Sequence, residues 1–179
     1  MRALIIIDAQ NEFSPLGKRP VPDHSEIIHT IGQRVEKARG NNYPIAWIRH
    51  FNKPTESPAF VPGTWGAEFV EGLGPRPGLT PETEFQKNVY GAFTGTNIGL
   101  WLKDLHVGAV EIAGFYTHGC VSTTAREAIM AGLDVYMHPA ATGACDMEHE
   151  IVGFQTAEEV RRTALLQLSN MGVILVERD

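Results

Sequence analysis

Cysteine is scarce in this chain of 179 residues, which contains only Cys120 and Cys145. Two cysteines cannot form a disulfide framework, and such scarcity is typical of proteins of the reducing cytoplasm. Long apolar runs are also missing, since no stretch approaches the ~20 residues that a membrane-spanning helix requires. The first apolar run meets an acid at Asp8, too early for a signal peptide. We therefore expect a cytoplasmic protein without a membrane partner.

A basic surface and a nucleotide-binding loop are lacking as well. The chain has 15 Lys and Arg against 21 Asp and Glu, a formal net charge of -6, and no basic run. This balance argues against a nucleic-acid partner. The first predicted strand continues into DAQNEF (8–13), which is neither a Gly-x-Gly-x-x-Gly turn nor a Walker A loop. We expect no nucleotide and no other cofactor.

What the sequence does contain is an alternation of short apolar runs with stretches of helical period. The runs that predict strands lie at 3–8, 44–50, 109–114, 133–138 and 173–177. Helices are predicted from Ser25 to Gly40, after Thr96, from Cys120 to Ala131, and after a capping box at Thr156 and Glu159. The Pro- and Gly-rich segment 52–81 has neither period and is predicted to be a long surface excursion. Alternation of this kind predicts a parallel sheet with helices on both faces, in one domain.

Three reactive residues stand where such a sheet would gather them, beyond the C-terminal ends of its strands. Asp8 ends an aliphatic strand, and Lys87 lies in a short β-like stretch at 85–90. Cys120 is predicted to begin a helix, whose free N–H groups and dipole would favour the thiolate. A lysine near both groups can stabilise a thiolate and keep the carboxylate ionised. Each residue alone could be structural: a core cysteine, a turn-capping acid, a surface lysine. Their joint placement favours a site.

Four stretches resemble the isochorismatase-like cysteine hydrolase superfamily, which includes nicotinamidases, N-carbamoylsarcosine amidases and ureidoacrylate-type amidohydrolases. They are ALIIIDAQNEF (3–13), KNVYGAF (87–93), GFYTHGCV (114–121) and TTAREA (123–128). The resemblance extends over nearly the whole chain. It implies an α/β fold: a three-layer, doubly wound, Rossmann-like domain over residues 1–179, with a six-stranded parallel sheet and helices on both faces.

The resemblance also implies catalytic roles. It assigns the catalytic acid to Asp8, the lysine to Lys87 and the nucleophile to Cys120. It further implies a cis peptide bond between Phe115 and Tyr116, so that the N–H groups of Tyr116 and Cys120 form an oxyanion hole. The expected reaction is acyl transfer: Asp8 accepts the thiol proton, the sulfur attacks a carbonyl carbon, and water hydrolyses the resulting thioester.

Around this centre we expect a substrate pocket that takes a small molecule. Phe13 is predicted to supply an apolar wall beside Gln10, and Trp65 to be displayed by a tight turn. His118 could be a second acid or base, or could pack away from the site. The predicted pocket residues are Gln10, Phe13, Trp65, Phe93, Phe115, Thr117 and His118.

No metal site is expected. Nicotinamidases carry an Asp-x-His ligand cluster after the second strand, where this chain offers only His50. A second conceivable cluster comprises His138, Cys145 and His149 with Asp146, but its spacing matches no strong zinc pattern.

The sequence is consistent with three functions. The cysteine favours a hydrolase of a small amide or ureide C–N bond, because strict isochorismatases cleave a vinyl ether without it. The second is an ether hydrolase of that type, which would use Asp8 and form no covalent intermediate. The third is a catalytically silent oligomeric binding or scaffold protein of the same fold. The family habit also predicts a homo-oligomer, a dimer or tetramer.

Overall fold

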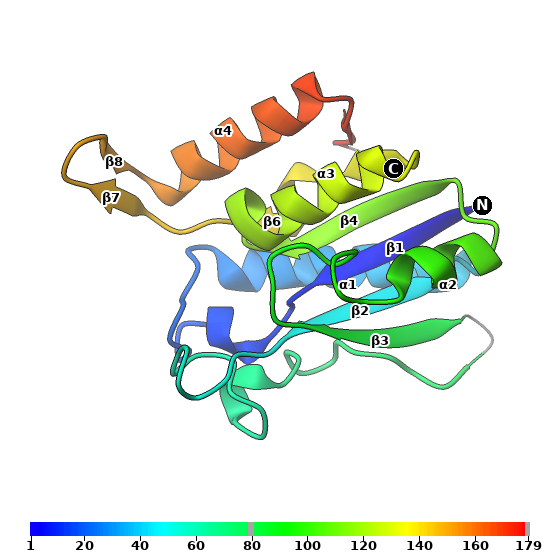
Figure 1. Ribbon diagram of the computed structural model, residues 1–179, viewed down its shortest axis with the longest axis horizontal. Coiled ribbons are helices and arrows are strands. Elements are labelled where there is room, and N and C mark those ends of the chain that lie inside the picture. Colours follow the sequence, from blue (N-terminus) through cyan, green and yellow to red (C-terminus); the bar gives the residue numbers. More distant parts are fainter. Residues whose placement is uncertain (79–80, 178–179) are drawn as a thin grey trace.

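A parallel β-sheet forms the centre of the computed structural model, which describes residues 1–78 and 81–177 (Figure 1). Its main strands lie side by side in the order β3-β2-β1-β4-β5-β9. In that order they span Glu82–Lys87, Ile45–His50, Arg2–Ile7, Ala109–Phe115, Asp134–Met137 and Ile174–Leu175. A two-residue strand, β6 (Thr142–Gly143), pairs with β4 off this path and makes the sheet seven-stranded. The predicted doubly wound sheet is confirmed, with one short strand more than expected.

The order of the strands reverses direction between β1 and β4. From β1 the chain proceeds outward through β2 to β3, then returns to β4 on the other side of β1 and proceeds outward through β5 to β9. All these neighbours pair in parallel, so their C-terminal ends lie at one edge. A reversal of this kind is where open α/β sheets bind ligands. Asp8 follows β1 directly, and Cys120 follows β4.

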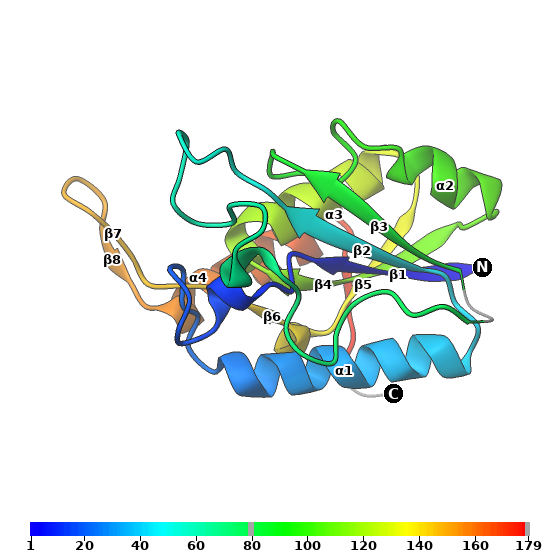
Figure 2. The same ribbon diagram turned by 90° about the horizontal axis from the view of Figure 1, so that it is seen from below.

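Helices cover both faces of the sheet. Figure 2 shows α1 (His24–Gly40) on one face and α2 (Ile98–Asp104) with α3 (Ser122–Met130) on the other. The fourth helix, α4 (Ala157–Asn170), packs with α3 through Leu165 and Leu168. Strand β1 supplies both cores by period-two alternation: Ala3, Ile5 and Ile7 face α2 to α4, whereas Leu4 and Ile6 face α1. None of the helices in the described residues is long and apolar enough to cross a membrane.

Two predicted helix starts need correction. Helix α1 begins at His24, so Ser25 is inside it and caps nothing; its N-cap is Asp23, whose φ is 57° and whose side chain makes no capping bond. Cys120 does not begin a regular helix, because a π-type turn at Thr117–Val121 precedes α3. The capping box is confirmed, since Thr156 and Glu159 exchange side-chain to backbone hydrogen bonds at the start of α4.

The excursion after β2 is irregular, as predicted; its residues 79 and 80 lie outside the described part. It contains one 3-10 turn, Trp65–Ala67, and one antiparallel bridge from Phe69 to Gln10. A hairpin of β7 (Met147–His149) and β8 (Gly153–Gln155) was not predicted. It projects beyond the sheet edge at which the strands end (Figures 1 and 2).

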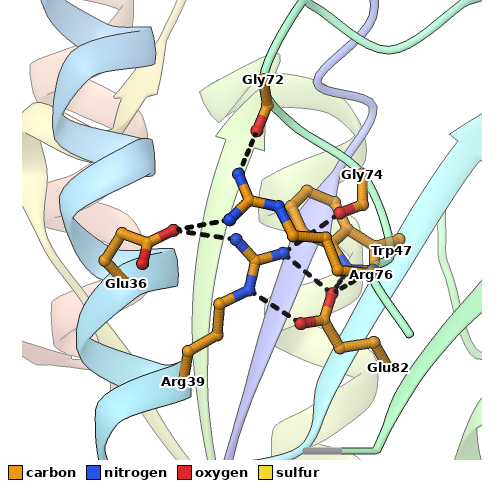
Figure 3. Close-up of polar contacts among 7 residues, drawn as sticks. All are labelled: Glu36, Arg39, Trp47, Gly72, Gly74, Arg76 and Glu82. Atoms are coloured by element: carbon orange, nitrogen blue, oxygen red, sulfur yellow. Dashed lines mark hydrogen bonds and ion pairs between the residues drawn. The ribbon is translucent and has the colours of Figure 1, made fainter. Parts of the chain in front are cut away.

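A buried carboxylate, Glu82, anchors the excursion to the sheet and to α1 (Figure 3). It accepts two hydrogen bonds from the Arg39 guanidinium, at 2.8 and 3.0 Å, and one from the Trp47 indole at 2.8 Å. The backbone N–H of Arg76 donates to the same carboxylate at 3.1 Å, and Arg39 also donates to the Gly74 carbonyl. This network joins α1, β2, β3 and the end of the excursion.

Candidate active site

The first side chain of the site is Asp8, which leaves the sheet in a left-handed conformation with φ of 52°. Its N–H donates to the Ile48 carbonyl at 3.0 Å, which ties the turn to β2. On the other side, a Cβ on Gly114 would lie 1.9 Å from the Ile7 carbonyl oxygen. Only glycine therefore allows β4 to approach β1 at the point where Asp8 emerges.

Lys87, the last residue of β3, joins three elements through its ammonium group. Its Nζ donates to Asp8 Oδ2 at 2.8 Å, to His50 Nδ1 at 3.2 Å and to Cys120 Sγ at 3.3 Å. An ammonium has three N–H donors, so each is used once. The side chains of Lys87 and Asp8 are 0% and 1% exposed. The structure thus brings together all three residues that the resemblance assigns to catalysis.

The electrostatics of this cluster favour a neutral thiol beside an intact ion pair. Burial by itself would lower the pKa of Lys87, but the charge of Asp8 and the hydrogen bonds to Asp8 and Cys120 outweigh it and raise that pKa. Burial and then the Asp8 carboxylate raise the pKa of Cys120, and Lys87 opposes them only in part. The expectation that the helix would favour a resting thiolate is therefore wrong, because the sulfur is desolvated next to an anion and precedes α3. Asp8 Oδ1 is buried and has no hydrogen-bond partner in the described residues.

His50, at the end of β2, completes the surroundings of the ammonium. Burial and then the Lys87 charge lower its pKa, so the ring is neutral at pH 7. Since Nδ1 accepts from Lys87, the ring proton is on Nε2 and donates to Asn52 Oδ1 at 2.9 Å. The Gln10 side chain holds the His50 backbone at both polar atoms, accepting from its N–H at 2.8 Å and donating to its carbonyl at 3.0 Å.

Ligand atoms of Asp8, His50 and Cys120 lie within 4.8 Å of one another, a spacing that a metal ion could use. The Lys87 ammonium makes hydrogen bonds to all three, however. A cation in that space would have to displace the ammonium, and both ring nitrogens of His50 are already engaged. These residues therefore do not fit a metal ion.

The turn that presents the sulfur begins with a cis peptide bond between Phe115 and Tyr116, as the resemblance implies. Phe115 is fully buried in the core under α1, and its ring stacks on His24. Thr117 is also fully buried, and its hydroxyl bonds Thr142 at 2.9 Å. These two side chains fix the turn from below.

A cavity of about 670 Å³ opens over the sulfur at the predicted edge of the sheet. Its walls come from the loops after β1, β2 and β3, from the turn around Cys120, and from the start of the β7–β8 hairpin. It is lined by Asp8, Phe13, Arg19, His50, Asn52, Phe60, Asn88, Val89, Tyr90, Tyr116, His118, Gly119, Cys120, Thr123, Cys145 and Met147.

Of the seven residues predicted to line the pocket, Phe13 and His118 lie on its wall. His118 stacks on Tyr116, with ring centroids 5.0 Å apart, and burial lowers its pKa. The other five lie elsewhere. Gln10 is buried beneath His50, Trp65 is 54% exposed on the excursion, and Phe93 packs against the core that faces α2. Phe115 and Thr117 support the turn, as described above.

The histidines and the acid of the second conceivable metal cluster serve local turns instead. His138 accepts from the Ala140 N–H and His149 from the Ile151 N–H, both through Nδ1. Asp146 accepts from the Ala157 N–H at 2.7 Å. Cys145 is a free thiol on the cavity wall.

Sequence reasoning did not assign a role to several lining residues. His50 had a signal, because it ends a strand next to β1 and the strand-end rule applies to it as to Asp8. No such signal marked Arg19, Phe60 or Tyr90. These residues come from irregular loops, and no periodicity in the sequence predicts the path of such loops.

Known proteins resemble this chain over most of its length. Residues 2–176 match the family model described as an isochorismatase domain. The secreted isochorismatase effector Isc1 of Verticillium dahliae is 32% identical, over 98% of this chain and 88% of its own. Nicotinamidase 3 of Arabidopsis thaliana is 30% identical, over 83% of this chain and 76% of its own. The crystal structure of an isochorismatase from Pseudomonas putida superposes with a TM-score of 0.90 at 26% identity, covering 98% of this chain and 87% of that one.

Proposed function

The chain belongs to the isochorismatase family of hydrolases, and we propose that it hydrolyses a small amide or ureide C–N bond through a thioester on Cys120. The observation that carries the proposal is the single ammonium of Lys87, which donates to both the Asp8 carboxylate and the Cys120 sulfur at the floor of a cavity. The similarity to a nicotinamidase supports an amide as substrate.

In the first step, the Cys120 sulfur attacks the carbonyl carbon while Asp8 takes the thiol proton. A thiol with a raised pKa needs such a base, and the unpartnered Asp8 Oδ1 is available to accept the proton. The Lys87 ammonium stabilises the sulfur as it becomes anionic. The C–S bond forms as the carbonyl π electrons move onto the oxygen.

In the next steps, the N–H groups of Tyr116 and Cys120 hold the tetrahedral oxyanion, an interaction in which one lost donor costs ~3 kcal/mol. The oxyanion re-forms the carbonyl, the C–N bond breaks, and Asp8 returns its proton to the leaving nitrogen. Water, deprotonated by Asp8, then attacks the thioester and releases the acid, and the sulfur recovers its proton.

The test is ammonia release from a panel of small amides and ureides, nicotinamide included, together with intact-mass detection of an acyl adduct. We expect Cys120→Ala to lower kcat/KM at least about a thousandfold and to abolish the adduct. Cys145→Ala is the matched control, because the adduct should still form when the other thiol is removed.

Unchanged ammonia release from Cys120→Ala would exclude covalent catalysis. Cleavage of a vinyl ether that survives Cys120→Ala but not Asp8→Asn would instead identify the ether hydrolase. Absence of any turnover by the wild type, with substrate analogues still bound, would indicate the silent binding protein.

We propose a cytoplasmic location, for which both cysteines being free thiols is the support, although one relative is named as secreted. We also propose a homo-oligomer in which a second copy covers the β7–β8 hairpin. An isolated hairpin is marginally stable in water, and this one exposes 81% of Ile151, 83% of Val152 and 57% of Phe154. Sedimentation of the purified protein tests the assembly.

A further inference from the structure

One charged group on the cavity wall has no part in the catalytic cluster. Arg19 lines the cavity, and among the described residues no carboxylate lies within ion-pair distance of its guanidinium. Its neighbour Lys18 is committed elsewhere, since its Nζ donates to the Pro58 carbonyl at 2.6 Å and lies 4.0 Å from Glu12.

The remaining groups of the cavity leave this charge uncompensated. Asp8 is balanced by Lys87, with which it forms a buried ion pair. Burial lowers the pKa of His50 and of His118 and raises the pKa of the Cys120 thiol. All three groups are therefore neutral at pH 7. Arg19 itself is exposed, so within the described part of the chain the one unbalanced charge of the cavity lies at its solvent-facing rim, in a protein whose formal net charge is -6.

The backbone around Arg19 is anchored next to the reacting centre. Its N–H donates to the Glu12 carbonyl at 2.9 Å, and its own carbonyl accepts from the Tyr116 hydroxyl at 3.1 Å. Glu12 in turn is 2% exposed and accepts from the N–H groups of Lys18 and Phe60. The loop that carries Arg19 is thus fixed to the residue whose N–H the proposed mechanism uses.

Aromatic rings line the same cavity as Arg19 and the Cys120 sulfur. The Phe13 ring contacts Phe60 and Tyr116, with centroids 5.1 and 4.8 Å apart, and Tyr116 stacks on His118. The buried Nδ1 of His118 has no hydrogen-bond partner in the described residues. Flat apolar walls with one positive charge suit an acyl group that is compact and anionic.

We infer that Arg19 is a specificity-determining residue that binds a carboxylate on the substrate, so that the preferred substrates are small amides bearing an acid group. The inference rests on the proposed C–N hydrolysis for its chemistry. A guanidinium suits this role because its planar fork can bind both carboxylate oxygens. The carboxylate would sit at Arg19 while the amide carbonyl reaches Cys120.

Matched pairs of amides test the inference. Succinamate and succinamide form an aliphatic pair, and phthalamate and phthalamide an aromatic pair; each pair differs in whether the distal group is a carboxylate or a neutral amide. Affinities are measured by calorimetry in the non-reacting Cys120→Ala background, and kcat/KM in the protein with Cys120 intact. We expect Arg19→Gln to weaken binding of the acid in at least one pair roughly tenfold or more. Binding of its neutral partner should weaken less than about threefold. Arg19→Lys should restore part of the loss, and Arg162→Gln, the same change on exposed α4, should have no effect.

The two proposals fail in different ways. If no amide is hydrolysed but acids still bind better than their neutral partners through Arg19, the proposed function is wrong and the specificity inference stands. If amides are hydrolysed without preference for the acids, or if Arg19→Gln weakens both members of each pair equally, the inference is overturned and the hydrolase stands.

Discussion

For the individual residues, the chemistry of this site depends on the protonation state of each side chain in the cluster. Lys87 can donate to His50 only while that ring is neutral, and Lys87 in turn holds the Asp8 carboxylate. Protonation of His50 would set two cations against each other inside a buried cluster. Desolvation and the Lys87 charge prevent this near neutral pH by lowering the pKa of His50.

The pH dependence of the wild type should report this titration. Because the pKa of folded His50 lies below its ordinary value of 6.5, the unfolded chain binds this proton first as the pH falls. Stability should therefore decline below about pH 6.5, and kcat/KM should fall as the pH drops through the lower, folded pKa. His50→Gln keeps an acceptor for Lys87 and should shift the acid limb of the kcat/KM profile to lower pH.

His29→Gln is the control, since this histidine is exposed on α1. The His50 assignment is wrong if kcat/KM of wild type and His50→Gln, measured from pH 4.5 to 8, follow the same curve.

At the scale of elements, the site depends on how closely two strands approach. Every residue of β1 pairs with β4, from Arg2 opposite Ala109 to Ile7 opposite Gly114. At that last pair the β4 backbone has a φ of 126° and approaches the Ile7 carbonyl too closely for any Cβ. The same pair positions Asp8 on one strand and the turn leading to Cys120 on the other.

Gly114→Ala should therefore be strongly destabilising. The added methyl group would lie 1.9 Å from the Ile7 oxygen, in a backbone region that alanine rarely adopts. We expect the free energy of unfolding to fall by about 3 kcal/mol or more in urea titrations. Gly108→Ala is a matched control, since its Cβ would meet nothing within 4 Å, and its effect should stay within ~0.5 kcal/mol. Equal stabilities of the two variants would contradict this account of the strand contact.

At the scale of the whole molecule, the long excursion is attached to the framework by a few buried polar groups. The Glu82 side chain is 3% exposed and joins α1, β2, β3 and the segment around Arg76. Burial by itself would raise the pKa of Glu82, but hydrogen bonds from Arg39, Trp47 and Arg76 outweigh it and lower that pKa. Glu82 is therefore ionised in the folded protein.

Glu82→Gln should lower the free energy of unfolding by about 2 kcal/mol at pH 7, because Arg39 loses its buried counter-ion. Since the folded pKa is depressed, this contribution is complete above the ordinary value of 4.5 and is lost as the pH falls through the folded pKa. The difference between wild type and variant, from urea unfolding at several pH values, should therefore shrink in acid. Glu150→Gln, at an exposed position in the hairpin turn, should be neutral throughout. A difference that is independent of pH would show that the charge of Glu82 is not what stabilises the fold.

The class of fold and the strand ends that carry the chemistry follow from the amino-acid sequence alone. Short aliphatic runs bounded by turn residues, such as the one before Asp8, favour strands buried on both faces, and helices of period 3.6 cover those faces. These are local rules of burial, so they can be applied along the chain. The resemblance to the cysteine hydrolases then selected Asp8, Lys87 and Cys120, which the structure places around one ammonium group.

The protonation of the site and the walls of the cavity depend on contacts between segments that are distant in sequence. The direction of the Cys120 pKa shift depends on desolvation and on an anion that is distant in sequence, and neither is encoded in the helix that follows. Arg19 and Phe60 reach the cavity through irregular loops, which are held by single buried groups such as Glu12. Contacts of this kind leave no periodic pattern in the sequence, because they form only when segments that are distant in sequence fold against one another.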